Sequence, residues 1–333
     1  MTSQPFYHLR PNKFIDRYLF VQVLSGLQKE FGIEKYQYIG FGSYMFDDFK
    51  ILHNRLGISD MISLEGDKAV YRRAEFNKPY ECIKVENIRS SVFINDFSRG
   101  KNFIFWLDYT SSFELGEQFS EFCTLVGTKM DVGDIVRITL NANPGNLDDK
   151  DDKSAGKRKA QEQIHKMRID ELRERIPSYM PSQTSKKDMS AENFPVFLLS
   201  CLKKAAINAL TPSDYQKKYL FPLFSSVYAD GQQMVILTAI VLDNTDDEGK
   251  IQECLCQYSD FVKFEWDKPC YIRIPELTTK EIIHINSLLP NSGSKKIKEK
   301  FGFAFESDLK VDDAIKSYIN YYKYYPNFHH VNL

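Results

Sequence analysis

The sequence lacks long hydrophobic runs, CxxC cysteine pairs and an excess of charge of either sign. No stretch reaches the roughly 18 uninterrupted apolar residues that a membrane helix needs, and the opening MTSQPFYHLRPNKF contains no apolar signal segment. The six cysteines form no CxxC pair, and Cys254 and Cys256 have no matching His cluster, which disfavours a structural zinc site. These absences predict a cytoplasmic protein with reduced thiols and no membrane partner.

Charge and composition set further limits. The net charge is −1, so nothing global indicates nucleic acid, and any basic surface must be local. The chain has 333 residues, of which 43% are hydrophobic and 27% charged, as in ordinary soluble globular proteins. This length suffices for one large α/β domain, or for a domain with a substantial appendage.

Helix and strand signals alternate through the first 145 residues. A helix is predicted over 12–32, with Asn12 as a plausible N-cap and Gly32 as the stop. Strands are predicted at YQYIGF (36–41), DMISLE (60–65), ECIKVE (81–86), NFIFWLDY (102–109) and DIVRITLNA (134–142), with helices between them. This order predicts a parallel sheet with right-handed crossovers, which binds ligands at the carboxyl ends of its strands.

Residues 148–190 interrupt the alternation. The segment is highly charged, with a helical middle and polar edges, and it is predicted to be an insertion that is mobile at both ends. Acidic residues are interleaved with its basic ones, which favours a solvated helix face over a phosphate-binding patch for Lys153, Lys157, Arg158, Lys159, Lys166 and Arg168. A helix at 194–210 follows, and then a hairpin around ADGQQ (229–233).

Candidate site residues lie at the ends of the predicted strands. The first strand runs into GFGS, where Gly40 and Gly42 permit a tight turn before Ser43. The second strand stops at Glu65, 25 residues after Gly40, and its carboxylate could accept hydrogen bonds from two hydroxyl groups. The fourth strand ends at Asp108, a carboxylate at the mouth of a buried strand.

Five alternating βα units, followed by a helix and a terminal antiparallel hairpin, resemble the class I S-adenosylmethionine-dependent methyltransferases over residues 33–243. The resemblance implies an α/β Rossmann-like fold with a mostly parallel seven-stranded sheet, the last strand inserted antiparallel. It suggests a lid helix at 1–32, a methyltransferase-like domain at 33–147 and 191–245, the helical insertion at 148–190, and a small C-terminal subdomain at 246–333.

The resemblance also implies roles for the candidate residues. The turn containing Gly40, Gly42 and Ser43 would approach S-adenosylmethionine, and Glu65 would accept its ribose hydroxyls. The family's turn is acid-x-Gly-x-Gly-x-Gly, and this sequence departs from it with Tyr38 and Tyr44; Asp47 and Asp48 could supply the missing acid.

Other roles fall on the third and fourth strands. Glu86 matches the family position that contacts adenine, and Asp96 is an alternative. At the fourth strand, Asp108 would act as a base or would bind a divalent metal, while Tyr109 would position the substrate.

Three functional hypotheses follow. The first is a methyltransferase acting on oxygen in a small polar or nucleotide-like acceptor; without an N/D-P-P-Y/F motif, base amines of DNA are disfavoured and nucleic acid is not the favoured partner. The second is a degenerate methyltransferase-like domain that binds a nucleotide or a partner protein without catalysis, with bacterial defence as one setting. The third is a Rossmann-type enzyme for another adenosine-containing ligand. The hairpin favours the first two.

Overall fold

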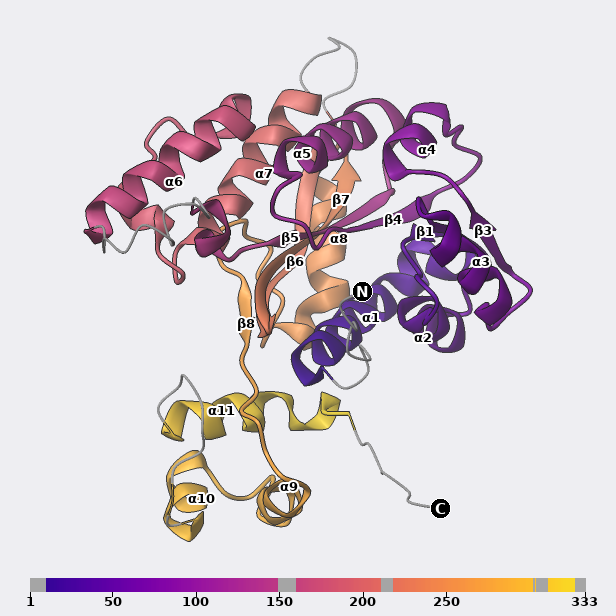
Figure 1. Cartoon of the computed structure of the whole chain (residues 1–333). Helices are drawn as coiled ribbons and strands as arrows, with labels where there is room; N and C mark the ends of the chain where they lie inside the picture. The colour runs from indigo at the N-terminus through magenta and orange to yellow at the C-terminus, as the bar shows by residue number, and fades with distance from the viewer. Residues whose placement is uncertain (1–9, 149–159, 211–217, 302, 304–310, 327–333) are drawn as a thin grey trace. The chain divides into compact units, whose positions relative to one another are not determined.

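A single eight-stranded sheet forms the centre of the fold (Figure 1). The computed structural model describes residues 10–148, 160–210, 218–301, 303 and 311–326. The strand order is β3-β2-β1-β4-β5-β7-β6-β8. The strands are β1 (Gln37–Gly40), β2 (Asp60–Leu64), β3 (Ile83–Glu86), β4 (Phe103–Asp108), β5 (Ile135–Asn141), β6 (Tyr219–Asp230), β7 (Gln232–Leu242) and β8 (Cys270–Ile272).

The sheet confirms the predicted fold class. Strands β1 to β5 pair in parallel, and β7 lies antiparallel to β5. Strands β6 and β7 are joined at Gly231. Its φ of 96° is a backbone conformation that residues with a side chain rarely adopt, so glycine suits this tight turn. The strand count differs from the predicted seven, because the three-residue β8 adds an eighth strand beside β6.

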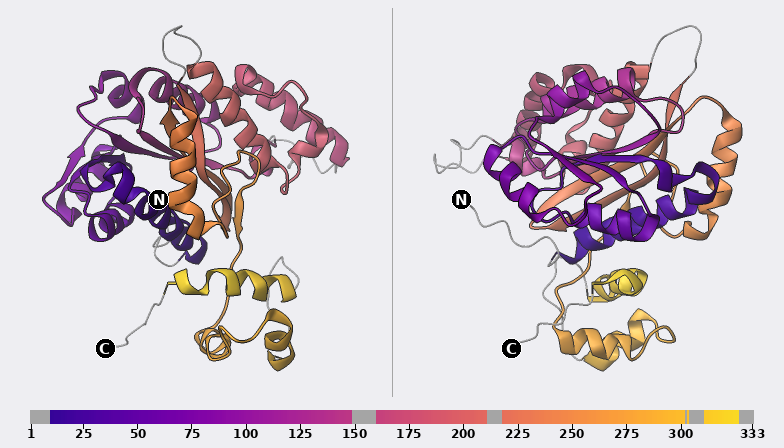
Figure 2. Two further views of the ribbon diagram at one scale, coloured as in Figure 1. Left: turned by 180° about the vertical axis from the view of Figure 1, so that it is seen from behind. Right: turned by 90° about the vertical axis from the view of Figure 1, so that its right-hand side faces the viewer.

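Helices connect the strands and cover the sheet (Figure 2). The described helices of the chain are α1 (Pro11–Phe31), α2 (Asp47–Leu56), α3 (Lys68–Asn77), α4 (Ser90–Asp96), α5 (Leu115–Thr124), α6 (Gln161–Arg175), α7 (Phe194–Leu210), α8 (Thr245–Leu255), α9 (Thr279–Asn286), α10 (Ser294–Phe301) and α11 (Val311–Tyr321); the last three follow the last strand. Helix α1 begins at Pro11, so the predicted N-cap Asn12 is wrong; its Nδ2 donates to Ala229 O instead. Among the described residues, no helix is long and apolar enough to cross a membrane.

The chain divides into two compact units. The larger comprises 20–227 and 232–270 and holds most of the sheet, together with α8. The smaller comprises the described parts of 1–19, 228–231 and 271–333, and contains α9, α10 and α11. The candidate strand ends all belong to the larger unit.

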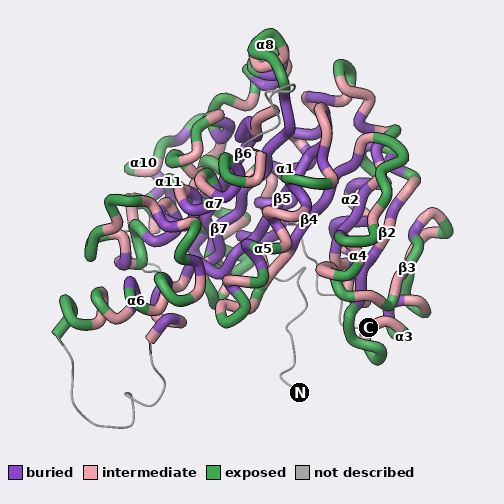
Figure 3. Tube along the Cα trace, turned by 90° about the horizontal axis from the view of Figure 1, so that it is seen from above, coloured by how far each residue is buried: buried purple, intermediate pink, exposed green. Residues whose placement is uncertain are grey.

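Strand β4 is buried on both faces, as its apolar run predicts. Phe103, Phe105 and Leu107 belong to a core cluster with residues of α4, α5 and α7. On the other face, Trp106 packs edge-on against Phe20 of α1, with ring centroids 5.6 Å apart. The fully buried Arg137 stacks over both rings and donates to Thr238 Oγ1 at 2.7 Å, so the centre of the sheet contains a hydrogen-bonded cation. Buried segments, coloured purple, follow the central strands of the sheet in Figure 3.

The described part of the charged insertion packs onto the core. Arg168 is buried, donates through Nε and Nη2 to the carboxylate of Asp148 at 2.7 and 2.9 Å, and donates through Nη1 to Met189 O. Arg175 Nη1 donates to Ser112 O at 2.9 Å. Of the basic residues predicted to form a solvated face, Lys166 is exposed but Arg168 is buried; Lys153, Lys157, Arg158 and Lys159 lie outside the described residues.

Candidate functional site

The turn after β1 is held by a serine from β2. The Gly42 N–H donates to Ser63 Oγ at 3.1 Å, and this Oγ lies 3.4 Å from Glu65 Oε1, to which it donates. Ser63 is fully buried. The structure therefore brings the predicted residues Gly42 and Glu65 together through a residue that was not predicted. The only signal in the sequence was a serine between the apolar residues Ile62 and Leu64 of the second strand.

Glu65 is a buried carboxyl group at the end of β2. Its side chain is 8% exposed and accepts a hydrogen bond from the backbone of Ser43. Burial is the main cause that raises the pKa of Glu65 to about 7; the hydrogen bonds from Ser43 and Ser63 oppose the rise, and the negative charges of Asp48 and Asp67 contribute to it. An acceptor so placed suits the hydroxyl groups of a ligand.

A second buried carboxyl group lies next to the turn. The Tyr38 hydroxyl donates to Asp48 Oδ2, and both residues are buried. The backbone before α2 turns back through Phe46, whose φ is 53°, and so brings the first turn of α2 under the end of β1. Tyr38, which replaces the family's acid, thus binds a carboxylate supplied by α2.

The space next to the two turn glycines is filled by the chain's own side chains. A Cβ on Gly40 would lie 2.7 Å from the Tyr38 hydroxyl, and a Cβ on Gly42 would lie 2.7 Å from both the Phe46 ring and Ser63 Oγ. Real Cβ atoms do not approach so closely, so glycine is required at both positions for packing within the turn.

The end of β3 braces Glu65 through its backbone. Asn87 Nδ2 donates to Glu65 O at 2.8 Å, and Glu65 N–H donates to Glu86 O at 2.9 Å. The Glu86 carboxylate pairs with Lys84 at 2.5 Å. The alternative residue Asp96 is the exposed last residue of α4, seven residues before the first residue of β4, so it lies on a helix and not at the end of β3.

The end of β4 presents Asp108 and Tyr109. Asp108 is half-buried on the strand next to β1. The Tyr109 hydroxyl donates to Glu121 Oε2 at 2.6 Å, and its ring lies 5.8 Å from that of Phe41. Burial, reinforced by the Glu121 carboxylate, raises the pKa of Tyr109 well above its usual value, so this phenol stays neutral. Tyr109 therefore braces the strand end next to the turn.

The residues that could ligate a metal are dispersed. Within the described ranges, no group of three or more His, Cys, Asp or Glu side chains lies close enough to hold an ion. Asp108 thus has the chemistry of a metal ligand but no described neighbours that complete a set.

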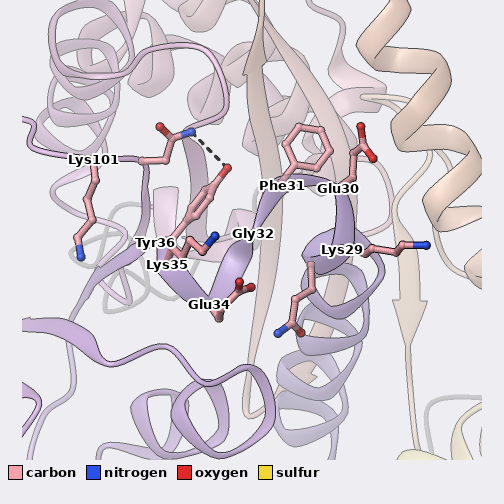
Figure 4. A pocket seen from close by; sticks show the side chains of 10 residues that line it. Lys29, Glu30, Phe31, Gly32, Glu34, Lys35, Tyr36 and Lys101 are labelled. Atoms are coloured by element: carbon pink, nitrogen blue, oxygen red, sulfur yellow. Dashed lines mark hydrogen bonds between the residues drawn. The ribbon is translucent and has the colours of Figure 1, made fainter.

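A surface pocket lies away from these strand ends (Figure 4). It surrounds the end of α1 and the start of β1. It therefore lies at the amino ends of the strands, whereas Glu65 lies at a carboxyl end. Asn102 Nδ2 donates to the Tyr36 hydroxyl within it at 3.3 Å. Its lining residues are Gln28, Lys29, Glu30, Phe31, Gly32, Glu34, Lys35, Tyr36, Lys101 and Asn102. None of them is a predicted site residue.

The strand order and the comparisons together define the class: the protein has the fold of a class I S-adenosylmethionine-dependent methyltransferase. Residues 5–333 match the family described as "Putative O-methyltransferase", so the chain belongs to that family. No curated protein matches the chain.

Solved structures of methyltransferases resemble the chain distantly. TYW2 from Pyrococcus horikoshii, in complex with MeSAdo, is 13% identical with a TM-score of 0.35, and the match covers 63% of this chain and 58% of that one. Trm1 from the same organism, in complex with S-adenosyl-L-methionine, is 8% identical with a TM-score of 0.39, and the match covers 72% of this chain and 57% of that one. The N-methyltransferase NodS from Bradyrhizobium japonicum is 10% identical with a TM-score of 0.35, and the match covers 68% of this chain and 96% of that one. The chain thus spans under two thirds of the length of TYW2 and Trm1.

Proposed function

We propose that this chain binds S-adenosylmethionine at the carboxyl ends of β1, β2 and β3 and transfers its methyl group to an oxygen atom of a polar acceptor, small or nucleotide-like. Membership of the family supports the reaction class. The main observation that supports this binding site is the Glu65 carboxyl group, which is buried at the end of β2 and accepts hydrogen bonds from Ser43 and Ser63 next to the glycine turn.

The residues present fit such a cofactor. Glu65, when ionised, accepts hydrogen bonds from the two ribose hydroxyls, and Ser43 keeps its carboxylate at the turn. Asp48, positioned by Tyr38, supplies the negative charge that favours a cationic methionine group. Glu86 is the proposed contact for adenine. The segment 1–32 is the proposed lid, and 148–190 and 246–333 are the proposed insertion and subdomain.

The bound cofactor would supply a methyl group on a positively charged sulfur. Asp108 then takes the proton from the acceptor hydroxyl as that oxygen attacks, which is the work of a general base. Its position at the end of β4, beside β1, suits this role. Tyr109 keeps the strand end in place through Glu121. A divalent metal held by Asp108 is the alternative for activating the acceptor.

One observation favours a second candidate function. The side chains of Tyr38, Phe46 and Ser63 fill the space next to Gly40 and Gly42. A cofactor that packs against the backbone of this turn would need that space. A domain with this turn would bind a nucleotide, or a partner protein, without transferring a methyl group.

Calorimetry separates the candidates. Titration with S-adenosylmethionine and S-adenosylhomocysteine should give saturable heat for the wild-type protein, and Glu65→Ala should weaken both ligands by about 10- to 100-fold. Radiolabelled methyl transfer to pools of hydroxyl-bearing acceptors then tests catalysis. Binding without transfer supports the degenerate domain. Absence of heat with both ligands, but heat with another adenosine-containing ligand, refutes the methyltransferase assignment.

A further inference from the structure

Four positive side chains surround the start of helix α3, next to the candidate site. Lys68, Arg72, Arg73 and Arg89 are all exposed, and none forms an ion pair with another described residue. The nearby acids have other partners: Asp67 Oδ1 accepts from the backbone of Ala69 and Val70, and Glu75 pairs with Lys78 at 3.3 Å. A protein with a net charge of −1 therefore has a local basic surface here.

Two of these arginines contact the loops that follow β1 and β2. Arg73 Cζ lies 3.6 Å from the centroid of the Tyr44 ring, in the turn after β1. Arg89 packs over Gly66, where a Cβ would lie 3.2 Å from Arg89 Cγ. Glycine at 66 therefore leaves room for Arg89 directly beside Glu65. A stacked guanidinium such as that of Arg73 loses less conformational entropy when it binds phosphate.

An exposed aromatic ring extends this surface. Lys68, Arg72 and Phe76 are four residues apart and so lie along one face of α3, about 6 Å apart along the axis. Phe76 is 89% exposed, which is exceptional for so large an apolar side chain. We define the α3 face as Lys68, Arg72, Arg73, Phe76 and Arg89.

We propose that the α3 face binds single-stranded nucleic acid, with its cations on successive phosphates and Phe76 stacked on a base. Grooves that bind single strands combine positive charge along the backbone with aromatic platforms. Three of the four cations are arginines, which bind phosphate bidentately and also stack on bases. Phe76 is the one large exposed apolar side chain of α3, too little apolar area for an interfacial membrane helix. This inference concerns binding and stands whether or not the chain transfers methyl groups.

Fluorescence anisotropy with labelled 12-nucleotide oligouridine and oligothymidine, between 50 and 200 mM salt, tests the proposal. The wild-type protein should bind, more weakly as salt rises. The double variant Lys68→Ala/Arg72→Ala should bind at least 10-fold more weakly. Its slope of log affinity against log salt should be smaller by about 1.4, because each phosphate contact on a single strand contributes about 0.7. The control Lys295→Ala/Lys296→Ala removes the same charge from the exposed face of α10 and should bind like the wild type.

Two variants test the stacking. Phe76→Ala and Phe76→Leu should each weaken binding by about 5- to 150-fold, the range expected for loss of one stacked base, while calorimetry with S-adenosylmethionine stays unchanged. Circular dichroism verifies that each variant is folded. The proposal is overturned by absence of binding at 50 mM salt, by an equal loss in the α10 control, or by Phe76 variants that bind like the wild type. Tighter binding to phosphatidylserine vesicles than to either oligonucleotide would assign the face to a membrane instead.

Discussion

The Tyr38 hydroxyl in β1 donates a hydrogen bond to the Asp48 carboxylate in α2, ten residues later, and both side chains are buried. We expect Tyr38→Phe to lower the free energy of unfolding by about 1–3 kcal/mol, because the buried carboxylate loses its donor. Chemical denaturation measures the change. Tyr80→Phe is the control: its hydroxyl donates to Asn54 at the exposed surface, so its loss should be within about 0.5 kcal/mol. Equal decreases in the free energy of unfolding for the two variants would mean that the buried Tyr38–Asp48 hydrogen bond stabilises the fold no more than an exposed one.

Gly42→Ala should destabilise the turn. The new Cβ would lie 2.7 Å from the Phe46 ring and from Ser63 Oγ, so one of these groups must move, at a cost of about 1–3 kcal/mol. Thermal unfolding measures the effect. Gly100→Ala adds the same methyl group where nothing lies within 4 Å, and it should leave the melting temperature nearly unchanged. A Gly42→Ala protein as stable as the wild type would show that the turn tolerates rearrangement.

The raised pKa of Glu65 predicts an effect on stability. Between about pH 4.5 and 7 the unfolded chain releases this proton while the folded protein keeps it, so stability should fall with rising pH in that window and level off above it. Glu65→Gln should flatten this part of the profile, because the amide does not titrate. Urea denaturation at successive pH values measures the slope, and an unchanged slope in the variant would contradict the assignment.

The same pKa predicts how affinity for the cofactor depends on pH. Only the carboxylate form accepts two hydroxyl hydrogen bonds, so affinity for S-adenosylhomocysteine should increase from pH 6 to pH 8. Calorimetry at both pH values tests this. The Glu65→Gln protein should bind more weakly at pH 8 and lose the pH dependence. A wild-type affinity that is flat over this range would remove Glu65 from the ribose site.

Asp108→Asn tests the proposed base. Turnover should fall by about 10²- to 10⁴-fold, while affinity for S-adenosylmethionine stays close to that of the wild type, since the proposed cofactor contacts lie at the ends of β1, β2 and β3. Asp96→Asn, at the exposed end of α4, should change neither. Chelation should abolish wild-type turnover only if Asp108 binds a metal. If Asp108→Asn loses both cofactor binding and thermal stability, this residue is a structural acid.

Arg168→Ala should loosen the insertion. Arg168 is buried in a bidentate bond to Asp148 and also binds Met189 O, so its loss leaves a partly buried carboxylate without that donor pair. We expect a loss of about 1–3 kcal/mol and faster tryptic cleavage of α6. Arg173→Ala removes an exposed residue of the same helix, paired only with Asp170 at 3.0 Å, and should behave like the wild type. Equal cleavage rates would show that Arg168 does not fasten α6.

The succession of strands β1 to β7 along the chain could be predicted because each of them has a local sequence pattern. The apolar run of β4 ends at Asp108, and the chain leaves β2 at Glu65. The fold class follows from that alternation. Strand β8 was missed because three residues give too short a pattern to separate from loop.

The details of the site depend on contacts that the sequence does not reveal. The Tyr38–Asp48 bond requires the positive φ of Phe46, a conformation uncommon for this residue type. Ser63 was missed because its role depends on the register between β1 and β2. Asp96, the predicted alternative to Glu86 for the adenine contact, is the last residue of α4. The insertion docks through Arg168 and Asp148, which are 20 residues apart in the chain.

The burial of Trp106 gives the protein an internal optical reporter. The sequence contains two tryptophans; Trp106 is buried against Phe20 and Arg137, whereas Trp266 is half-buried and lines a small cavity with Lys203 and Leu220. Iodide ions in solution can therefore quench Trp266 more readily than Trp106. In a Trp266→Phe protein the remaining emission would come from the centre of the sheet alone, so a change in fluorescence on adding a ligand would report rearrangement beneath β1 and β4 without any attached dye.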